Sequence, residues 1–284
     1  MDVDLRKLRY FVAVAEQLHF GRAAERLHIA QPVLSRQIRA LEEELKAQLF
    51  VRDKRRTELT AAGEQLLADA RPLLAAAEAL RRRVGRAARG RDTFTVGFMP
   101  GLIVTAAVRA LAQRHPELTV EVVRTTWDDQ VEVIRDGRVD VGYVRLPVDQ
   151  RGLRLRPLLT EPRVAVLPTE HRLAGKEVIS IADLAEDHLL QPPDAVPEWR
   201  DLATELREGR REPEPAFHSV EEKLEHVAAG QGVVVLPLSV ASFYTRPDLT
   251  HATVRDIADN QVCLAWDSAR RSPLIREFVA IAEG

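Results

Sequence analysis

The chain has 284 residues, 45% of them hydrophobic, and a formal net charge of −2, values typical of an ordinary soluble protein with two or three compact units. Its longest apolar runs, such as Val233–Leu238, are far shorter than the roughly 18 residues of a membrane span. The acidic start MDVDLRK is not that of a signal peptide, so we expect a cytoplasmic protein.

The charge is divided unevenly along the chain. Residues 1–91 contain 19 lysines and arginines against 12 acidic residues, whereas residues 92–284 contain 22 against 31. A basic segment favours a polyanionic partner, and an acidic remainder adds little to that contact. The first hypothesis is therefore a nucleic-acid-binding module joined to a domain of another kind. The alternative is a basic surface that is only solvated.

The N-terminal segment has the pattern of a winged helix-turn-helix. Amphipathic helices are predicted over residues 4–18 and 22–27, and after a short turn a third helix covers 30–45. The third helix carries a single apolar stripe of Leu34, Ile38, Leu41 and Leu45, and Pro32 lies in its first turn, where proline is tolerated. Next, LFVRDKRRTEL alternates around a charged tip, as the two strands of a wing would.

A single long helix is predicted from Thr60, its N-cap, to about Arg89. Apolar residues recur every seven positions along it, at Leu59, Leu66, Leu73, Leu80 and Ala87, with Ala70, Ala77 and Val84 as a second seam. Sustained heptads indicate a helix that pairs with another helix, so we expect at least a dimer. The alternative is packing on its own chain. Pro72 is expected to kink the helix.

From Thr93 onward the pattern changes to strands alternating with helices, which favours parallel α/β sheets with ligands at the strand ends. The predicted strands are TFTVGF, LTVEVV, DVGYV, RVAVLP, VVVLP and QVCLAW. Helices are predicted in IVTAAVRALAQRH and QVEVIRDG, and residues 200–215 look like a helix leaving into a loop. The single cysteine, Cys263, is interpreted as a small buried hydrophobe; a reactive thiol is the alternative.

The stretch FVAVAEQLHFGRAAERLHIAQPVLSRQIRALEEELKAQLFVRDKRRTELTAAGEQLL resembles the LysR-type transcriptional regulators, and LAQRHPELTVEVV, IRDGRVDVGYVRLP and VAAGQGVVVLPLSVA resemble their effector-binding domain. The resemblance implies an α/β protein with an N-terminal all-α winged helix-turn-helix over 1–58, a dimerising linker helix over 59–91 and a regulatory domain over 92–284. It implies two periplasmic-binding-protein-like lobes, about 92–162 with 263–284 and about 163–262. The implied partners are double-stranded DNA with a dyad operator, a small-molecule effector and further copies of the chain, commonly as a tetramer.

On this resemblance, the polar face of the third helix lies in the major groove of DNA. Arginine pairs there with guanine, glutamine with adenine, and serine with phosphate or base. The predicted DNA contacts on this helix are Gln31, Pro32, Ser35, Arg36 and Arg39. The wing residues Arg52, Lys54, Arg55 and Arg56 are expected at phosphates or in the minor groove. A solvated helix face is the alternative for the first group.

The family's effector lies between the lobes. Carried over, the contacts are Met99, Pro100, Gly101, Thr125, Thr126, Arg145, Gln191, His218 and Ser219. Several of these have a structural alternative. Thr126 and Asp129 form the pattern of a capping box, Arg145 either pairs with a ligand carboxylate or bridges the lobes, and His218 is also typical of a structural histidine.

Two positions depart from the family pattern. Ala30 stands where serine is frequent at the helix cap, and a lost cap costs on the order of 1 kcal/mol. Lys46 follows EEEL where glycine is common, which leaves the path into the wing open and adds a positive charge near the DNA.

Catalysis has no sequence motif to support it, since GxSxG, HExxH, CxxC and GxxxxGK[ST] do not occur. The sequence predicts no cofactor and no metal. We therefore expect a transcriptional regulator whose DNA binding or bending is switched by an effector. The alternatives are an architectural DNA binder without a ligand and, less favoured, an enzyme.

Overall fold

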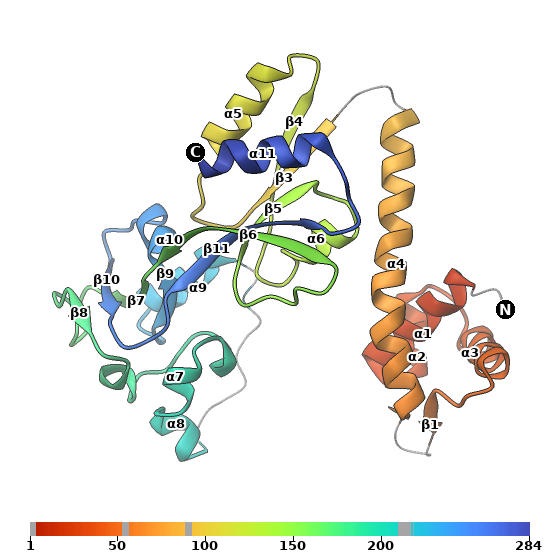
Figure 1. Ribbon diagram of the computed structural model, residues 1–284. Helices are drawn as coiled ribbons and strands as arrows, with labels where there is room; N and C mark the ends of the chain where they lie inside the picture. Colours follow the sequence, from red (N-terminus) through yellow and green to blue (C-terminus); the bar gives the residue numbers. More distant parts are fainter. Residues whose placement is uncertain (1–3, 53–56, 89–92, 210–216, 218) are drawn as a thin grey trace. The chain divides into compact units, whose positions relative to one another are not determined.

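A computed structural model describes residues 4–52, 57–88, 93–209, 217 and 219–284. They belong to two compact units, the first made of residues 1–90 with 135–138 and the second of residues 91–134 with 139–284. The first unit is mostly helical and the second mixes helices with two larger sheets (Figure 1). Within the described residues, no helix combines the length and apolar character needed to cross a membrane.

The first unit begins with three helices, α1 (Leu5–Gln17), α2 (Phe20–Arg26) and α3 (Gln31–Leu45). Side chains fix where the first two start. The Asp4 carboxylate accepts a hydrogen bond from the Arg6 amide at 2.8 Å, and His19 Nδ1 accepts one from the Arg22 amide at 3.2 Å. The second helix therefore begins two residues before its predicted start, because His19 acts as its cap. Helix α3 has no side-chain cap at Ala30, as the sequence predicts.

The wing is present as predicted, with β1 (Phe50–Arg52) antiparallel to β2 (Thr57–Leu59). Phe50 anchors this hairpin to the helices, since its ring lies 5.4 Å from that of Phe11 and 5.7 Å from that of Phe20. These aromatic side chains, together with the apolar stripe of α3, form one core for the whole unit.

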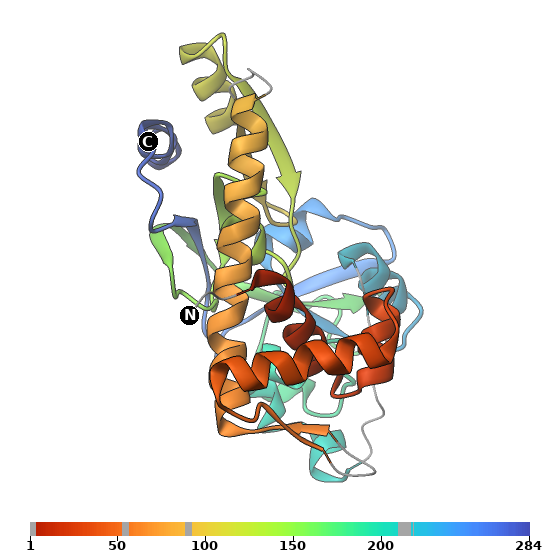
Figure 2. The same cartoon turned by 90° about the vertical axis from the view of Figure 1, so that its right-hand side faces the viewer.

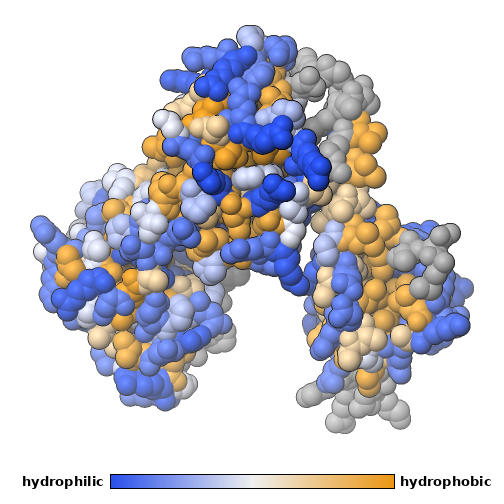
Figure 3. Space-filling model, viewed as in Figure 1, coloured by the Kyte–Doolittle hydropathy of each residue, from blue (hydrophilic) through white to orange (hydrophobic). Residues whose placement is uncertain are grey.

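The linker helix α4 (Ala61–Ala88) starts at the predicted cap: Thr60 Oγ1 accepts a hydrogen bond from the Gly63 amide at 3.0 Å. It continues through Pro72 without interruption. Its N-terminal half packs against the other helices of its unit, where Leu66, Leu67, Ala70 and Leu74 join their core (Figure 2). Leu73, next to Leu74 but outside that core, is 45% exposed, and further along the helix Leu80 and Val84 are 58% and 61% exposed. Figure 3 shows apolar surface on this part of the helix. Packing on its own unit therefore accounts for the N-terminal part of the heptad stripe, and pairing with another helix stays a prediction for the exposed positions.

The second unit contains a five-stranded sheet, which we call lobe I together with its helices. Its strands are β3 (Thr93–Phe98), β4 (Thr119–Arg124), β5 (Val141–Arg145), β6 (Leu153–Glu161) and β11 (Asn260–Asp267), in the order β4-β3-β5-β11-β6. Helices α5 (Thr105–Arg114) and α11 (Pro273–Glu283) share one core with the sheet. The short α6 (Glu132–Arg135) contributes to a separate core.

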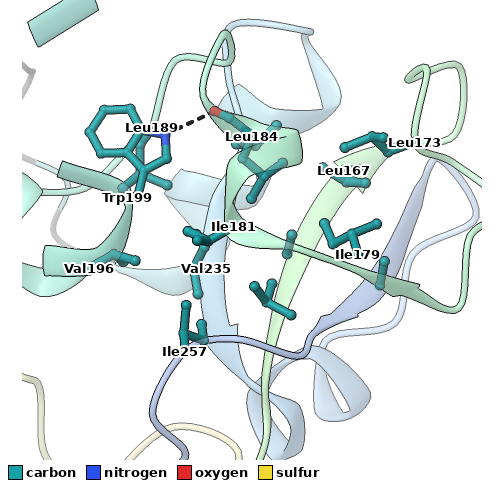
Figure 4. Packing of buried hydrophobic residues seen from close by; sticks show 14 of the residues in the cluster. Leu167, Leu173, Ile179, Ile181, Leu184, Leu189, Val196, Trp199, Val235 and Ile257 are labelled. Carbon is teal, nitrogen blue, oxygen red and sulfur yellow. Dashed lines mark hydrogen bonds between the residues drawn. The ribbon is translucent and has the colours of Figure 1, made fainter. Parts of the chain in front are cut away.

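A four-stranded sheet with its helices forms lobe II. Its strands are β7 (Arg163–Pro168), β8 (Val178–Ile179), β9 (Val234–Pro237) and β10 (Leu249–Val254), in the order β8-β10-β7-β9. Its helices are α7 (Pro197–Arg200), α8 (Thr204–Arg207), α9 (Val220–Ala228) and α10 (Leu238–Phe243). Trp199 is fully buried and donates a hydrogen bond from Nε1 to the Leu184 carbonyl at 3.0 Å (Figure 4).

The prediction of parallel sheets is correct only for β4, β3 and β5. Strand β11 runs antiparallel to β5 and β6, and β7 runs antiparallel to both β9 and β10. The chain passes from one sheet to the other through β6 and β11, and this return path produces the antiparallel pairs. Strands β6 and β10 were not predicted, because charged and polar residues interrupt their apolar pattern. The helix predicted in QVEVIRDG is reduced to the single turn α6.

Candidate nucleic-acid interface and ligand site

Helix α3 presents a polar face opposite its buried stripe. Leu34, Ile38 and Leu41 are at most 2% exposed. On the other side of the helix Gln31, Pro32, Arg36 and Arg39 are exposed, and Ser35 and Val33 are half-buried. Because the stripe anchors the helix in the core, the polar face is held rigidly outward.

The arginines of this face differ from three others in the same unit, which form ion pairs. Arg9 pairs with Glu78 at 2.9 Å, and Glu16 receives Arg26 at 2.8 Å and Arg71 at 3.4 Å. Within the described part of the chain, neither Arg36 nor Arg39 has an ion-pair partner. Their guanidinium groups therefore keep all their donors for a ligand.

Of the predicted DNA contacts in the wing, only the backbone of Arg52 belongs to the described residues. Arg52 ends β1, but its side chain and the whole of Lys54, Arg55 and Arg56 lie outside the described residues. Lys46, at the end of α3, adopts the left-handed conformation (φ 52°) that favours glycine, and its amide donates to the carbonyls of Glu42 and Glu43. The path from α3 toward the wing therefore follows the glycine geometry even though lysine occupies the position.

The predicted effector loop after β3 lies against lobe II. Met99 is fully buried and Pro100 is buried. Gly101 has a φ of +79°, and a Cβ atom there would lie 2.7 Å from the backbone of Val240 in α10. Thr125 is also buried and donates from Oγ1 to the Phe98 carbonyl at 3.1 Å. The structure thus brings Met99, Pro100, Gly101 and Thr125 to the lobe boundary.

Thr126 forms the predicted capping box. Its amide and hydroxyl donate to Asp129 Oδ1 at 2.7 and 3.0 Å, and its hydroxyl accepts from the Asp129 amide at 3.3 Å. Ser219 caps α9 by accepting from the Glu222 amide at 3.1 Å. Gln191 is buried and accepts from the Val235 amide at 2.9 Å. His218 lies outside the described residues.

Arg145, 1% exposed, is held by a network of protein groups. Its Nη1 donates to Glu161 Oε1 at 2.5 Å and to Asn260 Oδ1 at 2.7 Å, and its Nη2 donates to Ser239 Oγ at 2.7 Å and to the Pro100 carbonyl at 3.3 Å. Burial lowers the pKa of the guanidinium, and its bond to Glu161 opposes that shift. Since Ser239 belongs to α10 of lobe II, these contacts favour the bridging alternative for Arg145.

A second group of charged residues joins the lobes at their surface, and the sequence did not predict it. Arg124, at the end of β4, pairs with Glu221 in the first turn of α9 at 3.4 Å. The pKa of Glu221 is lowered, most of all by a hydrogen bond from the Glu221 backbone to its carboxylate. A hydrogen bond from Tyr244 and the charge of Arg124 also lower it. Lys223 is half-buried, and burial lowers its pKa while the charge of Asp128 opposes that shift.

The described residues contain no cluster of three or more side chains suited to a metal ion. Cys263 is buried in β11, and burial raises the pKa of its thiol. A raised pKa leaves less of the reactive thiolate, which favours the interpretation as a small hydrophobe.

Comparison with known proteins covers the whole chain. Residues 5–64 match the family model of the bacterial regulatory helix-turn-helix protein, lysR family, and residues 87–284 match that of the LysR substrate binding domain. The Hca operon transcriptional activator HcaR of Escherichia coli (strain K12) is 33% identical over 288 residues, 99% of this chain and 97% of the relative.

Two solved structures are similar over nearly their full length. The crystal structure of CbnR, a LysR family transcriptional regulator, has a TM-score of 0.57 and 26% identity, and covers 99% of this chain and 98% of CbnR. Full-length CbnR complexed with its target DNA has a TM-score of 0.51 and 28% identity over the same shares of the two chains. The sequence resemblance is thereby confirmed.

Proposed function

The chain belongs to the LysR-type family of DNA-binding transcriptional regulators, and from this membership we propose which of its residues contact DNA and effector. Members of this family bind DNA and small-molecule effectors and form oligomers. The proposed domains are 1–58 for DNA binding, 59–91 for dimerisation and 92–284 for effector binding. As a regulator of transcription that binds DNA, the protein acts in the cytoplasm.

Helix α3 reads a dyad operator in the major groove. The observation that carries this proposal is that Arg36 and Arg39 are exposed and lack ion pairs within the described residues, while Arg9, Arg26 and Arg71 of the same unit are paired. An unpaired guanidinium offers the bidentate fork that matches guanine O6 and N7. Gln31 and Ser35 flank these arginines, and the wing cations contribute phosphate contacts.

The test is operator binding by the full chain, with the DNA site first obtained by selection from a random pool. Arg36→Ala should weaken binding by about 1 to 3 kcal/mol and relax the preference at one base pair. Arg71→Ala is the matched control, because Arg71 is exposed but engaged by Glu16. Equal affinity of wild type and Arg36→Ala would contradict a base-reading role for Arg36.

The effector binds at the boundary between lobes I and II. This proposal is supported by the loop Met99–Gly101, in which Gly101 lies against α10 of lobe II. Thr125 supports it as well, because its hydroxyl bonds to the carbonyl of Phe98, the residue before this loop. Thr126, Gln191 and the start of α9 at Ser219 complete the proposed site, with His218 as a further candidate. A thermal-shift screen of small molecules against the full chain tests it, because a compound at about 100 times its Kd adds roughly 2.7 kcal/mol to stability.

Two copies of the chain pair through α4, and two such pairs form a tetramer. The exposed heptad positions Leu73 and Leu80, with Val84 beside them, support the pairing. Sedimentation of the full chain measures the number of copies. A monomer at micromolar concentration would contradict the proposal.

A further inference from the structure

Both connections between the lobes meet at one buried charged group. The first connection follows β6, which ends at Glu161; a single residue, Pro162, separates it from β7 of lobe II. The second leads from β10 to β11, which begins at Asn260. Arg145 reaches both, since its Nη1 donates to Glu161 Oε1 and to Asn260 Oδ1.

Lobe II is attached to the same group through the start of α10. The Ser239 amide donates to Glu161 Oε2 at 2.7 Å, and the Ser239 hydroxyl donates to Glu161 Oε1 at 3.1 Å. The Leu238 amide adds a bond of 3.0 Å to the Pro162 carbonyl. A rotation of lobe II that moves α10 relative to Arg145 must stretch the bond of 2.7 Å from Arg145 Nη2 to Ser239 Oγ.

The group also contacts the predicted effector loop. Arg145 Nη2 donates to the Pro100 carbonyl at 3.3 Å, and the Arg145 amide donates to the buried Gln130 Oε1 at 2.8 Å. The loop and α10 therefore share one guanidinium. Arg145 Nε is buried and has no hydrogen-bond partner among the described residues, so the network is not fully satisfied in this arrangement. An unsatisfied buried donor lowers the cost of leaving one arrangement for another.

We propose that Glu161, with Arg145 and Ser239, is an interlobe lock: these residues position the effector loop and hold lobes I and II at one mutual angle. The lock deepens the proposed effector function, on which its regulatory meaning rests, because an effector can switch the protein only by favouring one of two lobe arrangements. Arg145 and Glu161 are positioning residues in this proposal and need not touch the effector.

The test measures the distance between the lobes in the full chain by pulsed electron resonance. Spin labels are placed at Arg109→Cys on α5 and Glu170→Cys after β7, both exposed, in a Cys263→Ala background. Labelled protein is mixed with an excess of unlabelled protein so that only distances within one chain are recorded. Glu161→Gln should broaden the distance distribution, because an amide places a donor against the donors of Arg145 or Ser239. Ser239→Ala, which keeps the ion pair, should broaden it less.

Asp140→Asn is the matched control. Asp140 is also buried and pairs with Arg270, but both residues belong to lobe I. This variant should lower the unfolding temperature and leave the interlobe distribution unchanged. Unchanged distributions in both Glu161→Gln and Ser239→Ala, or equal broadening in Asp140→Asn, would overturn the lock. Should Glu161→Gln fail to fold, the distribution of Ser239→Ala decides. Failure of the thermal-shift screen would count against the effector site and leaves the distance result intact.

Discussion

Arginines serve opposite purposes in the two units of this protein. On α3, Arg36 and Arg39 are exposed and have no ion pair within the described residues. At the lobe boundary, Arg145 is buried and bound to a carboxylate, an amide, a hydroxyl and a carbonyl. The same side chain is thus free for a ligand in one unit and part of the structure in the other.

Burial explains the difference. An exposed guanidinium keeps its hydration and can exchange water for a base or phosphate at small cost. A buried one must be compensated by protein groups, and removing it leaves its partner as an uncompensated buried charge. Substitutions on α3 should therefore change binding with little effect on folding, whereas substitutions at the lobe boundary should change stability.

The largest effect is expected for Arg145→Met. It leaves the Glu161 carboxylate buried without its cation, and breaking a buried pair in this way costs about 3 to 5 kcal/mol. Denaturant unfolding of the full chain measures this loss. Arg36→Met is the control, and its stability should stay within about 0.5 kcal/mol of wild type. Similar values for the two variants would remove the distinction between the units.

The next largest effect is expected for Leu80→Glu, which places a charge in the exposed part of the heptad seam. Burial of one leucine contributes about 1.5 to 3 kcal/mol, and each copy loses one, so association of two copies should weaken by at least roughly 10- to 100-fold. Sedimentation measures it, with Ala68→Glu as the control at an exposed position outside the seam. Leu66→Glu should instead reduce folding stability, because Leu66 packs in the core of its own unit. Unchanged association of Leu80→Glu would place the interface elsewhere.

A smaller effect, on DNA binding, is expected for Arg39→Lys. Lysine keeps the charge but loses the planar fork, so we expect a loss of about 1 to 2 kcal/mol for the selected operator. The salt dependence of binding and the stability of the protein should not change, because the number of positive charges is the same. Unchanged affinity would mean that Arg39 meets a phosphate instead of a base, because lysine can also pair with a phosphate.

The smallest effect is expected for Lys46→Gly. Lys46 has a left-handed backbone at the end of α3, so glycine should raise the free energy of unfolding by about 1 kcal/mol. Glu43→Gly is the control inside the helix, where glycine should cost about 1 kcal/mol. A loss of stability in Lys46→Gly would show that the lysine side chain contributes more than its backbone strain costs.

Local patterns identified most of the first unit. Apolar spacing predicted α3 and its buried stripe, Pro32 in the first turn of α3 and the Thr60 cap marked helix starts, and the charge of the wing stood out in the sequence. These features depend on residues close in the chain, so periodicity and capping suffice to predict them. Glu161 and Ser239 gave no such signal, because they lie 78 positions apart and meet only after both sheets have formed.

By itself, the sequence determined the family, the helix-turn-helix, the linker helix and most strands of the lobes, because periodicity and motif spacing are local properties. Only the tertiary structure decided that β6 and β11 join the lobes in antiparallel pairs. It also decided that the N-terminal part of the heptad stripe packs on its own unit, and that Arg145 bridges the lobes. These outcomes depend on which distant surfaces become buried against each other, and burial sets both the partners and the energy of a charged side chain.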